Sequence, residues 1–328
     1  MRVLFAGSPA IAVPSLNALA EMELAREGVV LAGVLTNPDS PRGRRGGGEP
    51  TDVSAAAALL SAARAARALQ PVPQLKPEKL DAQAREAVAA LKPDLLASFA
   101  YGRIFGPKFL SLFPLGGVNI HPSLLPKFRG ATPIPAAILA CEQETGVTIQ
   151  KLVPETDAGD ILAQEIIPLT GKETTASLSG VAAQKGAFLL KELIRSLIAG
   201  TLRAVPQEGA PSFCSRIAKE DGLIDWTLSA VEIDARIRAY TPWPLSWTSC
   251  QGQNLFILEA APYAGALGAA ESPVPGAVLG AGKAAGILIR TGSGILAVTR
   301  LQYQTKKPLD WRSFLNGAKG FAGSVLGG

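Results

Sequence analysis

The chain has 328 residues, of which 48% are hydrophobic and 18% are charged, and its formal net charge is +5 at pH 7. This length allows two domains, each with a sizeable core. No run of about 18 apolar residues occurs, so no membrane span is predicted. The mild positive charge permits a polyanionic partner without requiring one. Three distant cysteines and a single histidine argue against a zinc site or a disulfide framework, and no metal is expected.

The first part of the chain alternates apolar strand patterns with helical patterns. Strands are predicted at 3–7, 29–37, 94–100, 117–120, 146–153 and 161–169, and helices from about residue 10 and at 52–70, 77–92 and 174–199. Strands separated by helices predict an α/β fold with a mostly parallel sheet covered on both faces. Because the first segment fits a buried strand better than a signal peptide, we expect a cytoplasmic protein.

The pattern changes after PQEGAPSF (206–213). Beyond it we predict one helix at 229–240 and strands at 245–250, 253–261, 276–281, 286–292 and 294–302. Gly and Pro between these strands favour a small barrel or sandwich. We therefore predict a first domain at 1–206, a linker at 207–211 and a smaller β domain at 212–328.

Two glycine-containing segments could bind phosphate groups. The turn GSPAIAVPSL after the first strand lacks the second and third glycines of the dinucleotide fingerprint, so a structural turn is the better interpretation and a nicotinamide dehydrogenase a poor one. The loop NPDSPRGRRGGGEP (37–50) carries Arg42, Arg44 and Arg45 without an apolar pattern. It predicts either a solvated surface loop or an arm that orders on nucleic acid.

The only histidine lies in GVNIHPSLLPKFRGATPIPAAILA (117–140). Asn119 and His121 are two residues apart at the end of a predicted strand, so their side chains point to the same face. Asp157, in the polar loop ETDAGD, could return over that edge. An amide, an imidazole and a carboxylate suit attack of an amine on an activated carbonyl. From spacing alone it stays open whether His121 is catalytic or merely satisfies a backbone group.

The segments NIHPSLLPKFRGATPIPAAILA and ETGVTIQKLVPETDAGDIL resemble the signature of the 10-formyltetrahydrofolate-dependent formyltransferases. The resemblance implies that Asn119, His121 and Asp157 are the catalytic residues and that 10-formyltetrahydrofolate is the co-substrate. SFAYGRIFGP and SLLP resemble the folate-binding segments, which implies folate contacts by the following residues: Tyr101, Arg103, Ile104, Ser123, Leu124, Leu125 and Pro126.

The resemblance extends over nearly the whole chain, including the opening RVLFAGSPAIAVPSLNAL, the segment GLIDWTLSAVEIDARIRAYTPWPLSW and the tail FLNGAKGFAGSVLG. These stretches are similar to the branch of the family that formylates methionyl initiator tRNA for translation initiation. They imply a Rossmann-like catalytic domain and an OB-fold-like second domain, acting as a monomer. Arg42, Arg44 and Arg45 would contact the acceptor end, and Lys306 and Lys307 would contact phosphates.

Weaker expectations concern the second half. Arg236 and Arg238 are either tRNA contacts or the polar face of a packed helix. Trp243 and Trp247 are expected to pack in a core or between domains rather than to stack on bases. Two alternative functions remain: a formyltransferase acting on an amino-sugar nucleotide, and a non-catalytic RNA-binding protein on the same fold.

Overall fold

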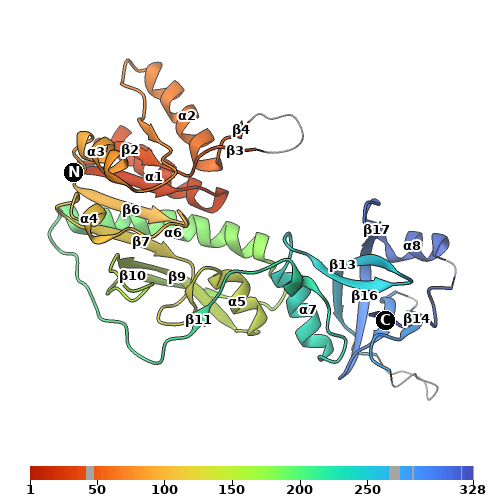
Figure 1. The fold of residues 1–328 in the computed structure, drawn as a ribbon. Helices are drawn as coiled ribbons and strands as arrows, with labels where there is room; N and C mark the ends of the chain where they lie inside the picture. The colour runs from red at the N-terminus through yellow and green to blue at the C-terminus, as the bar shows by residue number, and fades with distance from the viewer. Residues whose placement is uncertain (42–47, 266–273, 283, 319, 328) are drawn as a thin grey trace. The chain divides into compact units, whose positions relative to one another are not determined.

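The structure is a computed structural model that describes residues 1–41, 48–265, 274–282, 284–318 and 320–327 (Figure 1). Arg42, Arg44 and Arg45 lie outside the described residues. The chain forms two compact units. The first contains Met1–Pro133, Glu144–Pro168 and Ser179–Cys214, and the second contains Ile134–Gln143, Leu169–Leu178 and Ser215–Gly328. Two short segments of the predicted first domain, Ile134–Gln143 and Leu169–Leu178, therefore belong to the second unit.

The first unit is built on a seven-stranded sheet in the order β10-β9-β7-β6-β1-β2-β5. Its strands are β1 (Arg2–Gly7), β2 (Val30–Leu35), β5 (Gln74–Leu75), β6 (Leu95–Phe99), β7 (Gly117–His121), β9 (Glu144–Lys151) and β10 (Ile161–Pro168). The five strands from β7 to β5 are parallel, whereas β9 runs antiparallel to β7 and β10 antiparallel to β9. The predicted α/β class with a mostly parallel sheet is confirmed.

Helices accompany this sheet, and two short strand pairs lie outside it. The helices are η1 (Ala10–Ala12), α1 (Val13–Leu24), α2 (Asp52–Ala65), α3 (Ala82–Ala90), α4 (Pro107–Leu110) and α6 (Thr175–Ile198). The pairs are β3 (Ser40–Pro41) with β4 (Gly48–Glu49) and β8 (Arg129–Gly130) with β11 (Phe213–Cys214). Figure 1 shows α6 beside β6 and β7. A Cβ atom on Gly186 of α6 would lie 3.0 Å from Ile120, so this helix packs closely on the sheet.

Two predicted helices are shorter in the structure. The helix expected at 77–92 begins only after Asp81, because the Asp81 side chain accepts a hydrogen bond from the Ala84 amide and so caps α3. The helix expected at 52–70 ends at Ala65. At the last residue of β1, a Cβ atom on Gly7 would lie 2.8 Å from the Phe99 carbonyl oxygen. This glycine therefore permits close packing of β1 on β6.

The second unit contains an antiparallel sheet in the order β12-β13-β16-β15-β14, with β17 also paired to β16. Its elements are α5 (Pro133–Leu139), η2 (Glu220–Gly222), α7 (Ala230–Ala239), β12 (Ser246–Cys250), β13 (Gln253–Pro262), β14 (Val278–Gly282), β15 (Gly286–Arg290), β16 (Ile295–Tyr303), β17 (Leu309–Asp310) and α8 (Trp311–Gly317). Ile233 and Ile237 of α7 join Leu255 and Ile257 of β13 in its apolar core. The prediction of a smaller β domain after the α/β domain is confirmed, and the structure shows that its sheet is antiparallel.

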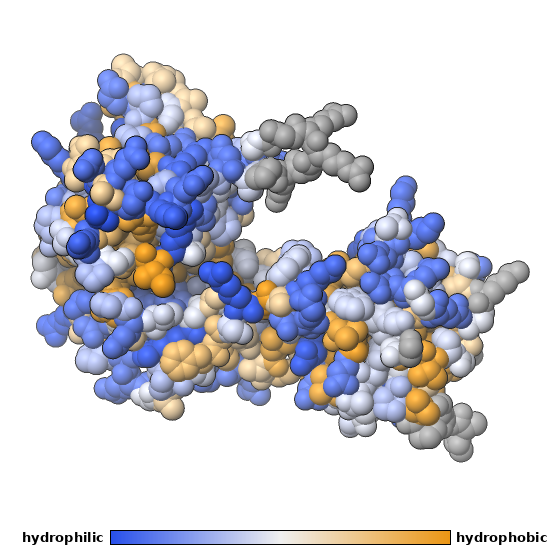
Figure 2. Space-filling view, viewed as in Figure 1, coloured by the Kyte–Doolittle hydropathy of each residue, from blue (hydrophilic) through white to orange (hydrophobic). Residues whose placement is uncertain are grey.

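One of the two tryptophans expected to pack is exposed. Trp243 is 58% exposed and so is not a core residue, whereas Trp247 is half-buried. Trp226 is the core tryptophan instead, and its indole nitrogen donates to Thr248 Oγ1 over 3.0 Å. On the face seen in Figure 2, apolar side chains are interspersed with hydrophilic ones.

Candidate active site

The neighbouring strands β7 and β9 present a row of polar side chains on one face. Asn119 is paired with Gln150, and His121 with Thr148. Residues two apart on a strand share a face, and so do residues directly opposite each other. His121 is 3% exposed and Gln150 only 1%. Such buried polar groups need hydrogen-bond partners, and the loops that follow these two strands supply them.

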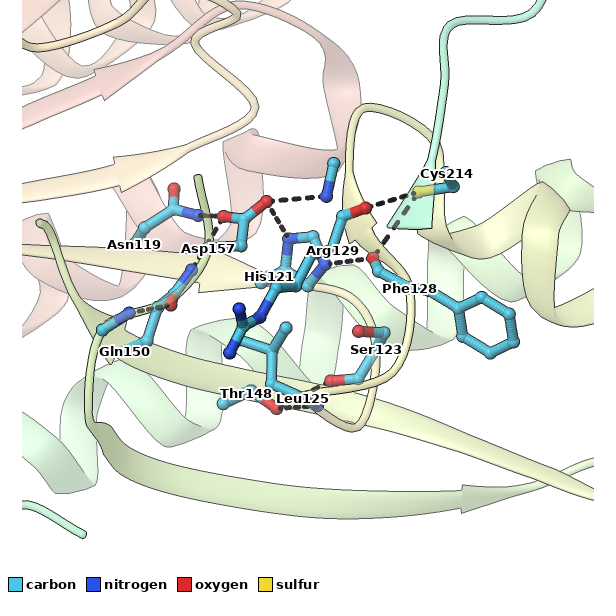
Figure 3. A network of polar contacts seen from close by, with 12 residues as sticks. Asn119, His121, Ser123, Leu125, Phe128, Arg129, Thr148, Gln150, Asp157 and Cys214 are labelled. Atoms are coloured by element: carbon cyan, nitrogen blue, oxygen red, sulfur yellow. Dashed lines mark hydrogen bonds and ion pairs between the residues drawn. The ribbon is translucent and has the colours of Figure 1, made fainter. Parts of the chain in front are cut away.

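Asp157 lies in the loop between β9 and β10, and its backbone has φ +50°. That left-handed conformation costs a residue with a Cβ atom about 1–2 kcal/mol. It directs the carboxylate between the side chains of β7 (Figure 3). Oδ1 accepts from Gln150 Nε2 over 2.7 Å and from Asn119 Nδ2 over 3.5 Å. Oδ2 accepts from the Gly130 amide over 2.9 Å and lies 3.6 Å from His121 Nδ1. The structure thus brings Asn119, His121 and Asp157 together.

The hydrogen bonds of His121 define which ring nitrogen faces the carboxylate. Nε2 lies 2.8 Å from the carbonyl oxygen of Phe128. A carbonyl can only accept, so Nε2 carries a proton and Nδ1 is the nitrogen that gains or loses one. Burial lowers the pKa of His121, and the Asp157 carboxylate and the Phe128 carbonyl oppose that change. Nδ1 is therefore a buried, titratable nitrogen next to a carboxylate.

The short β8–β11 pair forms one wall of this site. Gly130 has φ +116°, and a Cβ atom there would lie 2.2 Å from the Cys214 carbonyl oxygen, so only glycine allows both the pairing and the amide contact to Asp157. The Cys214 thiol donates to the carbonyls of Phe128 and Arg129 over 3.5 and 3.4 Å. Burial raises the pKa of this thiol. The Phe128 carbonyl thus receives both the histidine and the thiol.

The predicted folate segments lie on loops that follow β6 and β7. Within SLLP, Ser123 Oγ donates to the Lys127 carbonyl, and Gln164 Nε2 donates to the Leu125 carbonyl over 3.2 Å. The backbone of this segment is therefore held by side chains. Ser123 and Leu125 are buried, while Leu124 and Pro126 are half-buried.

The other folate segment shows a mixed pattern. Ile104 is 85% exposed. The Tyr101 ring is buried in a cluster with Phe105 and stacks on it at 5.4 Å, so only the Tyr101 backbone remains available. The Tyr101 carbonyl in turn accepts from Asn37 Nδ2 over 3.1 Å. Arg103 Nη1 donates to the Pro77 carbonyl over 2.8 Å and also to the Glu78 carbonyl.

The predicted tRNA contacts are only partly described. Lys306 and Lys307 are exposed in the turn after β16 of the second unit. Arg238 pairs with Asp234 at 2.8 Å and donates to the Glu173 carbonyl, which fits the packed-helix interpretation of that residue. Arg42, Arg44 and Arg45 lie outside the described residues.

Three residues of the site were missed by sequence reasoning: Gln150, Gly130 and Gln207. Gln150 had a usable signal, since it is the one amide side chain in the strand ETGVTIQK. Gly130 and Gln207 had none, because their roles depend on segments distant in sequence. Among the described residues, no group of three or more His, Cys, Asp or Glu side chains could hold a metal ion. In the same part of the chain no helix is long and apolar enough to cross a membrane.

An imidazole, an amide and a carboxylate at the end of a parallel strand define a group-transfer site that can stabilise a developing oxyanion and move a proton. Residues 1–194 match the family profile described as formyl transferase, and residues 216–319 match the one described as formyl transferase, C-terminal domain. The chain belongs to the formyl transferase family, and it is an enzyme of that class. The predicted family is confirmed.

Individual relatives support this membership. The chain is 48% identical over 323 residues to a protein from Treponema denticola named methionyl-tRNA formyltransferase, covering 98% of each. The structure of HypX from Aquifex aeolicus with tetrahydrofolic acid is similar, with a TM-score of 0.62 and 19% identity over 99% of this chain and 48% of that one. An N-formyltransferase from Helicobacter canadensis, bound to folinic acid and dTDP-3-aminofucose, has a TM-score of 0.63 and 21% identity over 90% and 98%. The last two likenesses concern the fold.

Proposed function

We propose that the chain transfers the formyl group of 10-formyltetrahydrofolate to the α-amine of methionine esterified to initiator tRNA. The observation that carries this proposal is the convergence of Asn119 and His121 on the Asp157 carboxylate at the carboxyl end of β7. The likeness to a full-length relative of that name supports the choice of acceptor, since it includes the second domain.

The polar groups of the site suit this reaction. A free α-amine titrates near ~7.7–8.0, so a substantial fraction is uncharged and nucleophilic at neutral pH. As the amine attacks, the formyl oxygen gains negative charge. The Asn119 amide donates to that oxygen, and His121 donates to it in the charged form, in which Nδ1 also carries a proton. Each such donor lowers the barrier by about 3–4 kcal/mol. Asp157 favours that charged imidazole and receives the proton that the amine loses. When the tetrahedral intermediate collapses, the bond between the formyl carbon and N10 of the folate breaks, N10 takes up this proton, and tetrahydrofolate leaves.

The co-substrate supplies an activated formyl group, so no metal is needed. We propose that the backbone of 101–104 and the segment 123–126 bind the folate. Side chains on the sheet hold this second segment in place, which is the kind of support a recognition loop requires: Thr148 Oγ1 donates to the Ser123 carbonyl over 2.7 Å and accepts from the Leu125 amide over 3.2 Å. Ile104 offers an exposed apolar surface.

The tRNA would be bound by separate groups of cations. We propose that Arg42, Arg44 and Arg45 meet the acceptor end and that Lys306 and Lys307 contact phosphates. Since this substrate is made in the cytoplasm, we propose that location, and we propose that the enzyme acts as a monomer with domains at 1–206 and 212–328.

The decisive experiment measures formyl transfer from 10-formyltetrahydrofolate to methionyl initiator tRNA by the native chain and by His121→Ala. We expect transfer by the native chain and a loss of at least about 10²-fold in the variant, because an acid–base group and an oxyanion donor are both removed. Glu155→Gln, an exposed position in the Asp157 loop, serves as the control and should retain native activity.

Two other results would redirect the assignment. If the native chain binds folate but formylates an amino-sugar nucleotide rather than the tRNA, the acceptor is wrong and the sugar alternative is correct. If it binds tRNA but neither binds folate nor transfers formyl, the chain is an RNA-binding protein on this fold.

A further inference from the structure

We propose that Gln207, which lies between the two matched family regions, is a positioning residue for Asp157. This inference rests on the proposed function and deepens it. Residues 195–215 lie between the two matched family regions and belong to neither. The sequence predicts only a linker at 207–211. In the structure this segment belongs to the first unit and is bound along the catalytic loop.

The amide of Gln207 lies at the centre of a hydrogen-bond network. Its Nε2 donates to the carbonyls of Asp157 and Gly159, each over 2.8 Å, and lies 3.3 Å from Gln150 Oε1. Its Oε1 accepts from Nε and Nη2 of Arg129 over 3.1 and 2.7 Å. Rotating the amide by half a turn would place its oxygen against carbonyls and its nitrogen against guanidinium donors. The chemistry of the partners therefore defines one orientation.

Hydrogen bonds on both sides of Gln207 hold the segment in place. Before it, Val205 and Ile161 exchange a reciprocal pair of backbone bonds of 2.7 and 2.9 Å. After it, Ser212 accepts from the Phe128 amide at its hydroxyl and from the Arg129 amide at its carbonyl, each over 2.8 Å. The segment thus connects the start of β10 with β8, and Gln207 lies between these two attachments.

Gln207 supports a loop that has little freedom to adjust. Asp157 has a left-handed backbone, and persistent strain of this kind requires surrounding contacts that define the conformation. A Cβ atom on Gly159 would lie 1.9 Å from the Lys151 carbonyl oxygen, so the loop already lies directly on β9. Gln150 Oε1 accepts from the Gly159 amide over 3.2 Å. Gln207 Nε2 in turn holds the carbonyls of Asp157 and Gly159.

The consequence concerns the distance between the Asp157 carboxylate and His121 Nδ1, which is 3.6 Å. With Nε2 of Gln207 removed, two loop carbonyls lose their donor, and the loop can leave its strained conformation. The carboxylate would then move relative to the imidazole. A misplacement of about 1 Å in a catalytic group can cost about 10²-fold in rate. Gln207 would act through Asp157 without touching the reacting atoms.

The test compares Gln207→Met, which has a similar shape but no polar group, with Gln207→Glu, which keeps an acceptor for Arg129 but lacks the donors. Glu208→Gln is the matched control, since Glu208 is the exposed neighbour on the same segment. We expect kcat to fall about 10- to 100-fold in both Gln207 variants, with KM for the tRNA changed less than about threefold. The control should behave as the native chain.

A second readout does not depend on activity. Because His121 is the only histidine, ¹³C-labelled histidine in a chain without a histidine tag gives one imidazole signal. Asp157 is the carboxylate that favours the charged imidazole. We therefore expect the His121 titration midpoint to fall in folded Gln207→Met and to stay unchanged in Glu208→Gln.

Several results would overturn the proposal. An unchanged midpoint with native kcat in Gln207→Met would remove the positioning role. A rise in KM alone would make the segment a tRNA contact, and native kcat in Gln207→Glu would assign the role to the Arg129 contact. Should Gln207→Met fail to fold, kcat of Gln207→Glu decides. Absence of formyl transfer by the native chain would sink the proposed function, while the titration would still test the position of Asp157.

Discussion

The lone histidine shows how a backbone carbonyl can define the chemistry of a side chain. The Phe128 carbonyl receives Nε2–H, which leaves Nδ1 as the only nitrogen of His121 that can exchange a proton with the site. Phe128 itself has φ +58°, a conformation that directs its carbonyl back toward the strand. His121 therefore satisfies a backbone carbonyl and also has a titratable nitrogen in the site. The two interpretations left open by its spacing, a packing role and a catalytic role, are not exclusive.

Asp157→Asn tests the charge next to this nitrogen. Burial lowers the pKa of His121 and the carboxylate opposes that change, so removing the charge should lower the pKa further. The single histidine signal should then titrate at a lower pH than in the native chain. A rate limb that requires protonated His121 should move to lower pH with it. A midpoint that rises, or that moves equally in Glu155→Gln, would contradict this account.

Asn119→Ala tests the second donor. The hydrogen bond from its amide to Asp157 Oδ1 is long, at 3.5 Å. The amide is therefore weakly held and can donate to a substrate oxygen. We expect kcat to fall about 10²–10³-fold with little change in KM, as for removal of an oxyanion donor. Asn17→Ala, the same substitution at an exposed position of α1, is the control. A change confined to KM would assign Asn119 to ground-state binding.

At the scale of elements, the site depends on a pair of strands that are each two residues long. The β8–β11 pair carries the Gly130 amide to Asp157 and closes the wall beside Phe128. Its strands are far apart in sequence, and each is too short to form alone. The pairing is stable because side chains assist it, including Ser212 Oγ as acceptor for the Phe128 amide.

Gly130→Ala should break this wall. The added Cβ atom would lie 2.2 Å from the Cys214 carbonyl oxygen, and φ +116° is strained for any L side chain. We expect the free energy of unfolding to fall by about 1–3 kcal/mol, together with a large loss of activity. Gly116→Ala is the matched control, because Gly116 also has positive φ but has nothing within 4 Å of its Cβ position. Equal loss of stability in both variants would show that backbone strain alone, without the contact to Cys214, explains the effect.

Features that depend on local sequence could be predicted, whereas features that depend on contacts between distant segments could not. The long strands and helices follow from local periodicity, so the parallel sheet and the smaller β domain were predictable, as was the shared face of Asn119 and His121. The motif also identified Asp157. Gln207 and Gly130 were not predictable. Gln207 acts through hydrogen bonds to residues distant in the chain, such as Gly159, which is 48 residues away. Gly130 acts through a pair of strands that are each two residues long. The core placement of Trp243 was wrong, because hydrophobic character alone does not require burial.

At the scale of the whole molecule, the proposed substrate is a polyanion, yet the chain's net charge is only +5. Affinity for tRNA would therefore depend on local cations rather than on overall charge. In the second unit, Lys306 and Lys307 occupy a defined turn. The Lys306 amide donates to the Tyr303 carbonyl over 3.0 Å, and Gln302 Nε2 donates to the Lys306 carbonyl over 2.6 Å. These bonds hold the backbone of Lys306, and the side chains of both lysines are exposed.

A salt titration of tRNA binding tests whether this lysine pair contacts phosphates. Each phosphate contact contributes roughly 0.7–0.9 to the slope of log K against log salt concentration, so the double variant Lys306→Ala, Lys307→Ala should lower the slope by about 1–2. Affinity at low salt should fall while kcat at saturating tRNA stays native, because the two lysines are proposed to bind phosphates and take no part in the formyl transfer step. Lys79→Ala with Lys108→Ala removes the same charge from exposed positions of the first unit and should leave the slope unchanged. If both double variants lower the slope equally, the effect comes from net charge, and the lysine pair has no specific part in binding the tRNA.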